Sequence, residues 1–504
     1  MSDHRFILRL SGDLYTKARD TRLRFLRRLH ANLRDALSSQ GFRYHLERTW
    51  SRFYLDTSHP EAAEVASRVF GIQSVSQAER RPWQTLDDVV RLGVEIFAPE
   101  VAGKTFGVRA SRRGKRDRIP FNSNAVEIAL GRALLEAAPG SRVDLDEPEV
   151  RAYVELEPGS GHFFRHKVRG HGGLPVGVEG RAVSLVSGGF DSAVASWLLL
   201  KRGVQLDYVF CNLGGAAHRL GVLKVMQVLA EGWSHGYHPR LTEVDFQALS
   251  DEIRAKTLPR NWQIHLKRMM LRAGEAVALR GRRAGLVTGE AMGQVSSQTL
   301  QNLAVISQAA STLPILRPLI GFNKDEILAI ARRAGVHDLA AAVNEYCDLA
   351  PKKPATRAPL AEILREDEAL DPALLEQALD ARCVFDLRRL APEDLAPTGL
   401  ETGRIAPDEV VLDLRPLSSY RTWHYPGALH LDFPRAVEAY PSFPPDKTYV
   451  VYCEVGLKSA HLAERMAAAG LRVRCFAGGM RALMALAEES QVLDPGLLAP
   501  AVRD

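Results

Sequence analysis

Long apolar runs are absent from the 504-residue chain, which nowhere approaches the roughly 18 consecutive apolar residues of a membrane-spanning helix. The first apolar segment, Phe6–Leu10, is short and contains Arg9, which does not suit the hydrophobic region of a secretory signal. We therefore expect a cytoplasmic protein with no membrane partner.

Cysteine is also scarce: the chain has five, at positions 211, 347, 383, 453 and 475. No two of them form a CxxC pair, which excludes a disulfide framework and disfavours a structural zinc site. A cysteine with a chemical role would act as a single reactive thiol. Cys211, Cys383 and Cys475 lie in apolar sequence contexts, which predicts packing for all three.

A strong net charge is absent as well, since the formal value is only +6, but the charge is unevenly distributed. Lys and Arg outnumber Asp and Glu by 12 to 6 in residues 1–60 and by seven to one in residues 104–118. Residues 362–401 carry 11 acidic and 4 basic side chains. Two basic blocks in one half of the chain favour a polyanionic partner such as nucleic acid, although a solvated protein face gives the same pattern.

Length and periodicity predict a globular chain of three or four domains. Two small α+β units are expected in the first 165 residues, with strands over 6–10, 105–109 and 150–156 and helices over 21–37, 61–70, 86–97 and 125–138. The helix over 86–97 should end before Pro99. The glycine-rich segment 170–175 then indicates a linker.

Beyond that linker, buried strands alternate with helices, which predicts a doubly wound parallel sheet. The strands are expected over 183–186, 206–213, 241–246 and 284–288, and a helix capped by Asn323 and Glu326 should end at Gly335. The acidic stretch 362–401, with Pro392 and Gly399, is predicted to be a second linker. A small α/β unit should follow it, with strands over 410–414 and 448–452 and a helix over 459–469.

The hexamer Ser187-Gly188-Gly189-Phe190-Asp191-Ser192 directly follows a predicted strand and opens a helix. Glycines let backbone amides turn toward an anion, and the helix N-terminus and two hydroxyls add favourable charge and donors. A carboxylate would repel a phosphate unless it helps to hold Mg²⁺ on a pyrophosphate leaving group. The alternative is an ordinary tight strand–helix turn. The hexamer resembles the PP-loop of ATP pyrophosphatases, which cleave ATP to AMP and pyrophosphate.

Three downstream segments extend the resemblance to the bacterial tRNA 4-thiouridine sulfurtransferases: Phe210–His218, Leu266–Met270 and Val287–Gln298. This resemblance implies an α/β multidomain protein. Its parts would be an N-terminal ferredoxin-like α+β unit (1–62), a THUMP RNA-binding domain (63–167), a doubly wound PP-loop ATP-pyrophosphatase domain (175–395) and a C-terminal rhodanese α/β domain (403–504).

The same resemblance implies roles for individual residues. ATP and Mg²⁺ would be used, with Asp191 serving the metal or the leaving group and Lys324 as a further catalytic cation, unless Lys324 is a solvated first-turn lysine. The implied ATP-binding residues are Leu185, Val186, Ser187, Gly188, Gly189, Ser192, Lys267, Gly289 and Gln298.

Cys453 follows a predicted strand and precedes a short loop and a helix, in Tyr452-Cys453-Glu454-Val455-Gly456-Leu457-Lys458-Ser459. Loop amides, the helix N-terminus and Lys458 would lower the pKa of the thiol and stabilise a thiolate. The segment resembles the active loop of rhodaneses, as do Val411–Arg415 and His424–Ala428. Glu454 departs from the usual basic loop and puts ordinary thiosulfate activity in doubt. A persulfide on Cys453 also requires that packed side chains do not cover its sulfur.

Cys347 matches the second cysteine of the family, which implies a Cys347–Cys453 disulfide during turnover; by itself Cys347 would be a packing residue. Arg112, Arg113, Lys115 and Arg116 lie in a predicted loop of the THUMP-like unit and suit contacts with RNA phosphates. The implied partners are tRNA, a cysteine desulfurase, a small sulfur-carrier protein of thiamine biosynthesis and a reductant.

Three hypotheses follow. In the first, ATP adenylates uridine 8 of tRNA and a Cys453 persulfide converts it to 4-thiouridine. In the second, the chain only relays sulfur to a carrier protein for thiazole synthesis. In the third, it is a non-enzymatic RNA-binding protein whose ATP site is regulatory.

Overall fold

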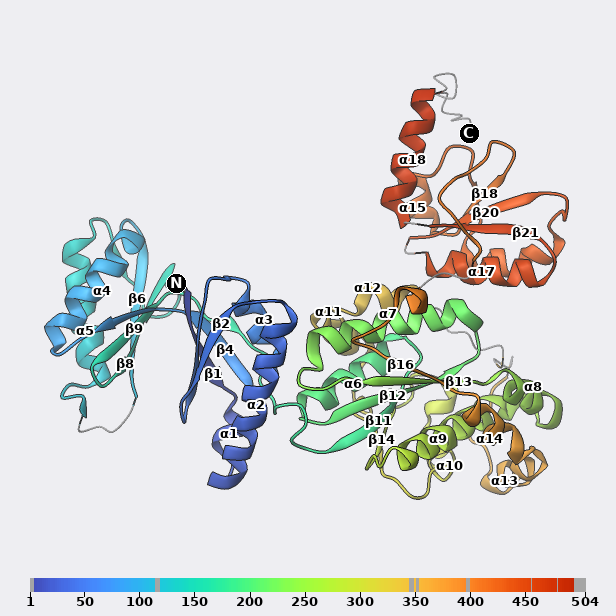
Figure 1. Ribbon diagram of the computed structural model, residues 1–504, viewed down its shortest axis with the longest axis horizontal. Helices are drawn as coiled ribbons and strands as arrows, with labels where there is room; N and C mark the ends of the chain where they lie inside the picture. Colours follow the sequence, from blue (N-terminus) through green and yellow to red (C-terminus); the bar gives the residue numbers. More distant parts are fainter. Residues whose placement is uncertain are drawn as a thin grey trace. The chain divides into compact units, whose positions relative to one another are not determined.

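The computed structural model describes residues 4–113, 118–343, 349, 353–395, 399–454, 456–477 and 479–493. The chain folds into two compact units, residues 1–179 with 201–203 and residues 180–200 with 204–504. In the part of the chain that the structure describes, each unit contains two sheets, and many of their elements are labelled in Figure 1. Among the described residues, no helix is both long and apolar enough to cross a membrane.

The first sheet of the N-terminal unit has the strand order β10-β4-β1-β3-β2, and all its pairs are antiparallel. The helix expected over 21–37 packs against this sheet, with Leu29, Leu33 and Leu37 fully covered. Residues 63–77, which the sequence analysis grouped with the THUMP domain, supply helix and strand to this first sheet. Its elements are β1 (His4–Leu10), α1 (Gly12–Tyr15), α2 (Arg19–Ser39), β2 (Tyr44–Arg48), β3 (Arg52–Thr57), α3 (Ala62–Arg68), β4 (Ile72–Gln77) and β10 (Val168–Arg169).

The second sheet has the order β5-β9-β8-β6-β7 and a separate apolar core. Its first helix runs on to Val101, so the prediction that it ends before Pro99 is wrong. Pro99 cannot donate the helical hydrogen bond to the carbonyl four residues earlier, but the burial of Val101 and Phe97, both fully covered, favours the longer helix. The elements are β5 (Glu79–Pro82), α4 (Leu86–Val101), β6 (Thr105–Arg112), α5 (Ser123–Ala137), β7 (Arg142–Val143), β8 (Val150–Glu157) and β9 (Ser160–Phe164).

The third sheet has the order β15-β14-β11-β12-β13-β16 and is parallel except for β16. This confirms the doubly wound parallel sheet. Strands β11 and β12 are buried over most of their length because helices cover the sheet. Its strands are β11 (Arg181–Leu185), β12 (Gln205–Asn212), β13 (Arg240–Asp245), β14 (Leu286–Val287), β15 (Ile315–Leu316) and β16 (Cys383–Asp386). Its helices include α6 (Phe190–Lys201), α7 (Gly215–Trp233), α8 (Gln247–Lys256), α9 (Trp262–Arg280), α10 (Leu300–Ser307), α11 (Lys324–Ala334) and α12 (His337–Ala342).

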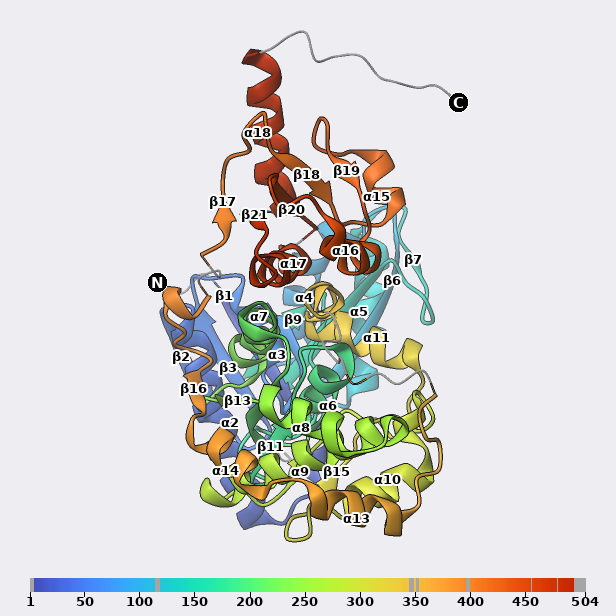
Figure 2. The same cartoon turned by 90° about the vertical axis from the view of Figure 1, so that its right-hand side faces the viewer.

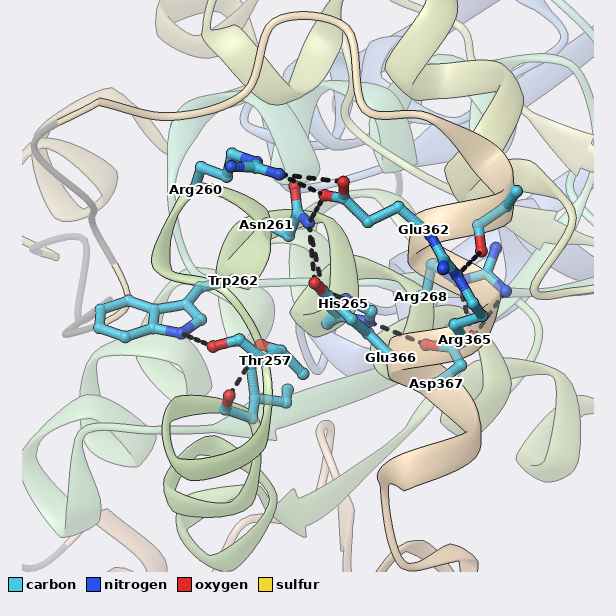
Figure 3. A network of polar contacts seen from close by, with 12 residues as sticks. Thr257, Arg260, Asn261, Trp262, His265, Arg268, Glu362, Arg365, Glu366 and Asp367 are labelled. Atoms are coloured by element: carbon cyan, nitrogen blue, oxygen red, sulfur yellow. Dashed lines mark hydrogen bonds and ion pairs between the residues drawn. The ribbon is translucent and has the colours of Figure 1, made fainter.

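The acidic stretch 362–401 is not a linker over most of its length, contrary to the prediction. It forms α13 (Leu360–Ala369), α14 (Pro372–Asp380) and the edge strand β16. Asp367 on α13 binds Arg268 of α9 at 2.7 Å, and His265 lies between Glu366 and Asp367 (Figure 3). These acidic side chains are therefore partly buried and paired with a basic helix. Cys383 lies exposed on the edge strand, so the packing predicted for it is wrong.

The fourth sheet, order β17-β21-β20-β18-β19, is made of parallel pairs and forms the C-terminal α/β domain (Figure 2). Its core includes Val451, Leu462 and Ala463, all fully buried. The strands are β17 (Glu401–Thr402), β18 (Val410–Asp413), β19 (Leu429–His430), β20 (Thr448–Tyr452) and β21 (Arg472–Phe476). The helices are α15 (Leu417–Thr422), α16 (Phe433–Ala439), α17 (Leu457–Ala468) and α18 (Gly479–Leu493).

Candidate functional site: two strand–loop–helix loops

The loop at residues 187–192 connects the carboxyl end of β11 to α6, as predicted. Ser187 N–H donates to Ser192 Oγ at 3.3 Å, and Ser192 Oγ donates to the Gly189 carbonyl at 3.2 Å. Gly188 has φ +79°, and a Cβ there would lie 3.0 Å from a methyl of Val343. The loop is thus closed on itself at the edge of a parallel sheet, where α/β proteins bind their ligands.

The Asp191 carboxylate binds side chains from two other segments of the domain. Lys324 Nζ lies 3.1 Å from Asp191 Oδ1, and the Gln294 amide donates to Oδ2 at 3.0 Å. Lys324 reaches the loop because α11 begins with the predicted Asn323–Glu326 capping box; the helix ends at Gly335, φ +76°. The first-turn lysine is therefore an ion-pair partner of the loop carboxylate. Gln294 was given no role from the sequence, although it lies inside the quoted segment 287–298.

Gly289 is held directly against the loop. A Cβ at this position would lie 2.6 Å from both the Asp191 carbonyl carbon and the Ser192 nitrogen, which is closer than real side chains approach. Gln298 holds the segment that follows Gly289 in a turn. Its side-chain oxygen accepts from Ala291 N–H at 3.3 Å, and its carbonyl accepts from Gly293 N–H at 2.9 Å. The structure therefore brings Gly289 to the PP-loop, while buried Gln298 shapes the adjoining segment.

Lys267 lies beside this segment and binds a carboxylate that the sequence analysis did not single out. Its Nζ is 3.3 Å from Glu290 Oε1, while Arg317 Nε donates to Glu290 Oε2 at 2.6 Å. Burial by itself would raise the pKa of Glu290, but Lys267 and Arg317 outweigh it, and the pKa lies below its ordinary value. Glu290 thus holds two cations next to the loop. An acidic residue directly after Thr288-Gly289 at a strand end was the available signal.

His218, in the first turn of α7, contacts the loop from the other side. Its Nε2 lies 3.2 Å from the Ser187 carbonyl, and burial lowers its pKa to about 4. The imidazole is therefore neutral near pH 7, and Nε2 must carry its proton in order to donate to the carbonyl. The segment Phe210–His218 was recognised in the sequence, but no role was assigned to this histidine.

Cys453 follows β20 and lies at the N-terminal end of α17, as predicted. Its Sγ accepts from Ser459 N–H at 3.4 Å and lies 3.5 Å from Ser459 Oγ. Only 5% of the residue is exposed, and it joins the apolar core of its domain, so the accessible thiol that the sequence analysis required is not found. The physical reason is that the amide of Ser459 lies at the base of the loop, and a sulfur that bonds to it must lie there too.

The strand before the cysteine is braced by a buried ion pair. Arg415 binds the fully buried Asp413 through Nε and Nη2, with the shorter distance 2.6 Å, and Tyr452 Oη donates to Asp413 at 2.7 Å. Arg415 Nη1 also lies 3.9 Å from Glu454 in the cysteine loop. The segment Val411–Arg415 therefore fixes the strand end from which Cys453 projects.

The remaining predicted residues are placed as follows. Cys347, Lys115 and Arg116 lie outside the described residues. Arg112 donates to the carbonyl of Phe121 at 2.7 Å, and Arg113 lies 3.3 Å from Glu155, so both guanidinium groups make contacts within the protein.

Cys211 and Cys475 are buried, which confirms the packing predicted for them. Burial raises the pKa of the Cys475 thiol to about 12, and it raises the pKa of Cys211 further. Within the described part of the chain, no group of three or more His, Cys, Asp or Glu side chains is arranged to hold a metal ion.

Family models match four successive segments of the chain. They are the ThiI ferredoxin-like domain over residues 5–76, the THUMP domain over 84–160, the thiamine biosynthesis protein ThiI over 177–371 and the rhodanese-like domain over 397–486.

Whole proteins match over nearly their full length. The chain is 35% identical to a tRNA sulfurtransferase of Pyrobaculum aerophilum, over 92% of this chain and 94% of the relative. It is 33% identical to a tRNA sulfurtransferase of Escherichia coli, over 90% and 96%. Among solved structures, a 4-thiouridine synthetase in complex with RNA and ATP aligns with a TM-score of 0.66 and 29% identity, covering 76% of this chain and 99% of that one.

Proposed function

This chain belongs to the tRNA sulfurtransferase family, and we propose that it converts uridine 8 of tRNA to 4-thiouridine through an adenylated uridine and a persulfide on Cys453. It is a tRNA sulfurtransferase that combines an ATP-binding PP-loop domain, a THUMP domain and a rhodanese domain. The observation that carries the finer proposal is the presence of the 187–192 loop and the Cys453 loop in one chain.

In the proposed first step, uridine O4 attacks the α-phosphorus of ATP, and pyrophosphate leaves. Ser187, Gly188, Gly189 and Ser192 bind the phosphates, with Lys267 and Lys324 as the nearby cations. Leu185 and Val186 contact the base; the Val186 N–H already donates to Val209, so its carbonyl makes that contact. Gly289 and Gln298 complete the nucleotide pocket. Fixed donors and cations around a leaving pyrophosphate stabilise the charge that develops there.

Asp191 is the residue that would hold Mg²⁺. Magnesium is commonly bound by one or two carboxylates together with substrate phosphates, and Asp191 is the carboxylate of the loop, with its side chain 26% exposed. The ion would neutralise charge on the pyrophosphate. Lys324 and Gln294 orient the two carboxylate oxygens.

In the proposed second step, the outer sulfur of the Cys453 persulfide attacks C4 of the activated uridine, and AMP leaves with the former O4. The Cys347 thiolate then attacks Sγ of Cys453, which releases 4-thiouridine and leaves a Cys347–Cys453 disulfide. A dithiol reductant restores both thiols. The outer sulfur of a persulfide extends about 2 Å beyond Sγ, which moves the nucleophile away from the base of the loop.

The partners follow from these steps. A cysteine desulfurase supplies the persulfide, and tRNA binds the N-terminal unit, where Arg112, Arg113, Lys115 and Arg116 belong to the basic segment. The family description as a thiamine biosynthesis protein supports a second role, in which Cys453 passes sulfur to a small carrier protein for the thiazole. Because both roles need reduced thiols, and one needs tRNA, the proposed setting is the cytoplasm.

A complete reaction tests the proposal. The full chain is incubated with a uridine-8 tRNA, ATP, Mg²⁺, cysteine, a desulfurase and a dithiol, and the digested nucleosides are analysed. We expect 4-thiouridine and stoichiometric AMP, and neither when ATP is left out. Pyrophosphate release that needs tRNA would exclude the third hypothesis, the regulatory ATP site. Thiolated carrier protein without thiolated tRNA would leave only the relay role.

A further inference from the structure

The first turn of α7 is in direct contact with α17 of the rhodanese domain. The Glu464 carboxylate accepts from the Ala217 N–H through both oxygens, at 3.1 and 3.2 Å. Backbone N–H groups in the first turn of a helix have no partner within the helix, and the helix dipole favours a negative charge there. Glu464 therefore satisfies a donor of the PP-loop domain with a side chain of the rhodanese domain.

Packing at this contact is close. Ala217 is fully buried and belongs to the same apolar cluster as Leu462 and Ala463 of α17. A Cβ at Gly215, whose φ is +68°, would lie 3.3 Å from Glu464 Oε2. The start of α7 thus completes the core of a domain that lies more than 180 residues further along the chain.

A second pair of charges supports the same contact. Partial desolvation raises the pKa of Glu401, an exposed residue on β17, and Lys224 on α7 opposes that rise. Burial likewise raises the pKa of Glu464, opposed by the Ala217 amide and by Arg219. Carboxylates of the rhodanese domain therefore face two cations, Arg219 and Lys224, that lie about one and a half turns apart on α7.

This surface adjoins both reactive loops. His218, next to Ala217, contacts the Ser187 carbonyl of the PP-loop, and His461 of α17 interacts electrostatically with His218. His461 lies four residues, about 6 Å along the helix axis, after the start of α17. That start directly follows the Cys453 loop.

We propose that the surface of α7 formed by Gly215–Lys224 is the docking site from which the rhodanese domain transfers its sulfur, with Glu464 as the docking carboxylate. This inference rests on the proposed function, because it concerns the transfer step of that reaction. Docking acts after the persulfide has been loaded and independently of uridine activation.

The test measures single-turnover transfer from full-length protein whose Cys453 has been loaded with radioactive sulfur by cysteine and a desulfurase. The readout is the rate at which labelled 4-thiouridine appears in tRNA with ATP in excess. We expect Glu464→Gln to slow transfer about tenfold and Glu464→Lys to slow it further, since a charge-assisted hydrogen bond is lost and then replaced by repulsion. Persulfide loading and tRNA-dependent pyrophosphate release should stay at wild-type levels, which also shows that the variants fold.

A control variant and a charge-reversal pair make the test specific. Glu438→Gln, an exposed glutamate on α16, is the matched control and should transfer at the wild-type rate. Lys224→Glu and Glu401→Lys should each slow transfer, and the double variant should recover most of the loss. Transfer that is unchanged or faster in Glu464→Gln would overturn the docking proposal, whereas absence of 4-thiouridine with the wild-type protein would overturn the proposed function instead.

Discussion

The loops at residues 187–192 and 453–459 follow the carboxyl ends of parallel strands and lead into helices, yet they differ in composition and in partners. The first contains two glycines and two hydroxyls, and its single carboxylate is bound by side chains from other segments, Lys324 and Gln294. The second directs its functional atom inward, where Ser459 of its own helix is the polar partner of Cys453. The same local architecture thus presents a carboxylate to side chains of other segments in one case and a covered thiol in the other.

Replacement of Cys453 by Ala should have the largest effect. The loop would lose the atom that carries the sulfur, so 4-thiouridine should fall below detection while tRNA-dependent pyrophosphate release persists. Cys475→Ala is the control, because its buried thiol has a pKa of about 12 and is inert. Undiminished 4-thiouridine in the Cys453 variant would remove the persulfide step.

Asp191→Asn affects the other loop and should give the opposite pattern. Loss of the carboxylate should slow pyrophosphate release about 100-fold or more, the usual effect of removing one group that stabilises developing charge. Loading of sulfur on Cys453 should continue at the wild-type rate. Asp325→Asn, an exposed aspartate beside Lys324, should retain full pyrophosphate release. Equal losses in both aspartate variants would contradict a specific role for Asp191.

Gly289→Ala tests the close approach to the PP-loop. The added methyl would meet the Asp191–Ser192 backbone at 2.6 Å, and the resulting shift should weaken ATP binding about tenfold, equivalent to roughly 1.4 kcal/mol. Gly321→Ala, which has open space around its Cβ, should bind ATP normally. Binding can be followed by calorimetry, and equal affinities would show that residue 289 does not shape the pocket.

The last expected effect concerns stability and not activity, and it depends on the protonation of His218. The pKa of His218 is about 4 in the folded protein and about 6.5 in the unfolded chain. Between pH 4 and 6.5 the unfolded chain therefore binds more protons than the folded protein. The associated stability is present above pH 6.5 and is lost as the pH falls toward 4, by about 2 kcal/mol between pH 7.5 and 5. His218→Gln keeps a hydrogen-bond donor but does not titrate. Its free energy of unfolding, measured with urea, should therefore fall less between pH 7.5 and 5 than that of the wild-type protein. Parallel pH profiles would contradict a buried neutral imidazole.

The sequence predicted the parallel sheet and the PP-loop well because their signals are local. Buried strands, a glycine pair and the Asn323–Glu326 capping box each specify a conformation within a few residues. Asp191 and Lys324, 133 residues apart, could be paired only through the family resemblance, and Gln294 and Glu290 were missed because their importance lies in what they contact.

The errors have a common cause, which is that tertiary contacts override local patterns. Pro99 stays in a helix because Val101 is buried. The acidic run on α13 looked like a solvated linker, but Glu366 and Asp367 bind His265 and Arg268. The burial of Cys453 depends on how the loop closes around Ser459, which the order of residues alone does not reveal.

Because α13, α14 and β16 belong to the PP-loop domain, the connection to the rhodanese sheet is shorter than the acidic composition suggests. Fourteen residues separate Asp386 from Glu401, which span at most about 50 Å when fully extended. This short connection keeps the rhodanese domain near the PP-loop domain of the same chain, which raises its effective concentration there. A rhodanese domain supplied as a separate polypeptide would therefore have to be present at comparable concentration to replace it.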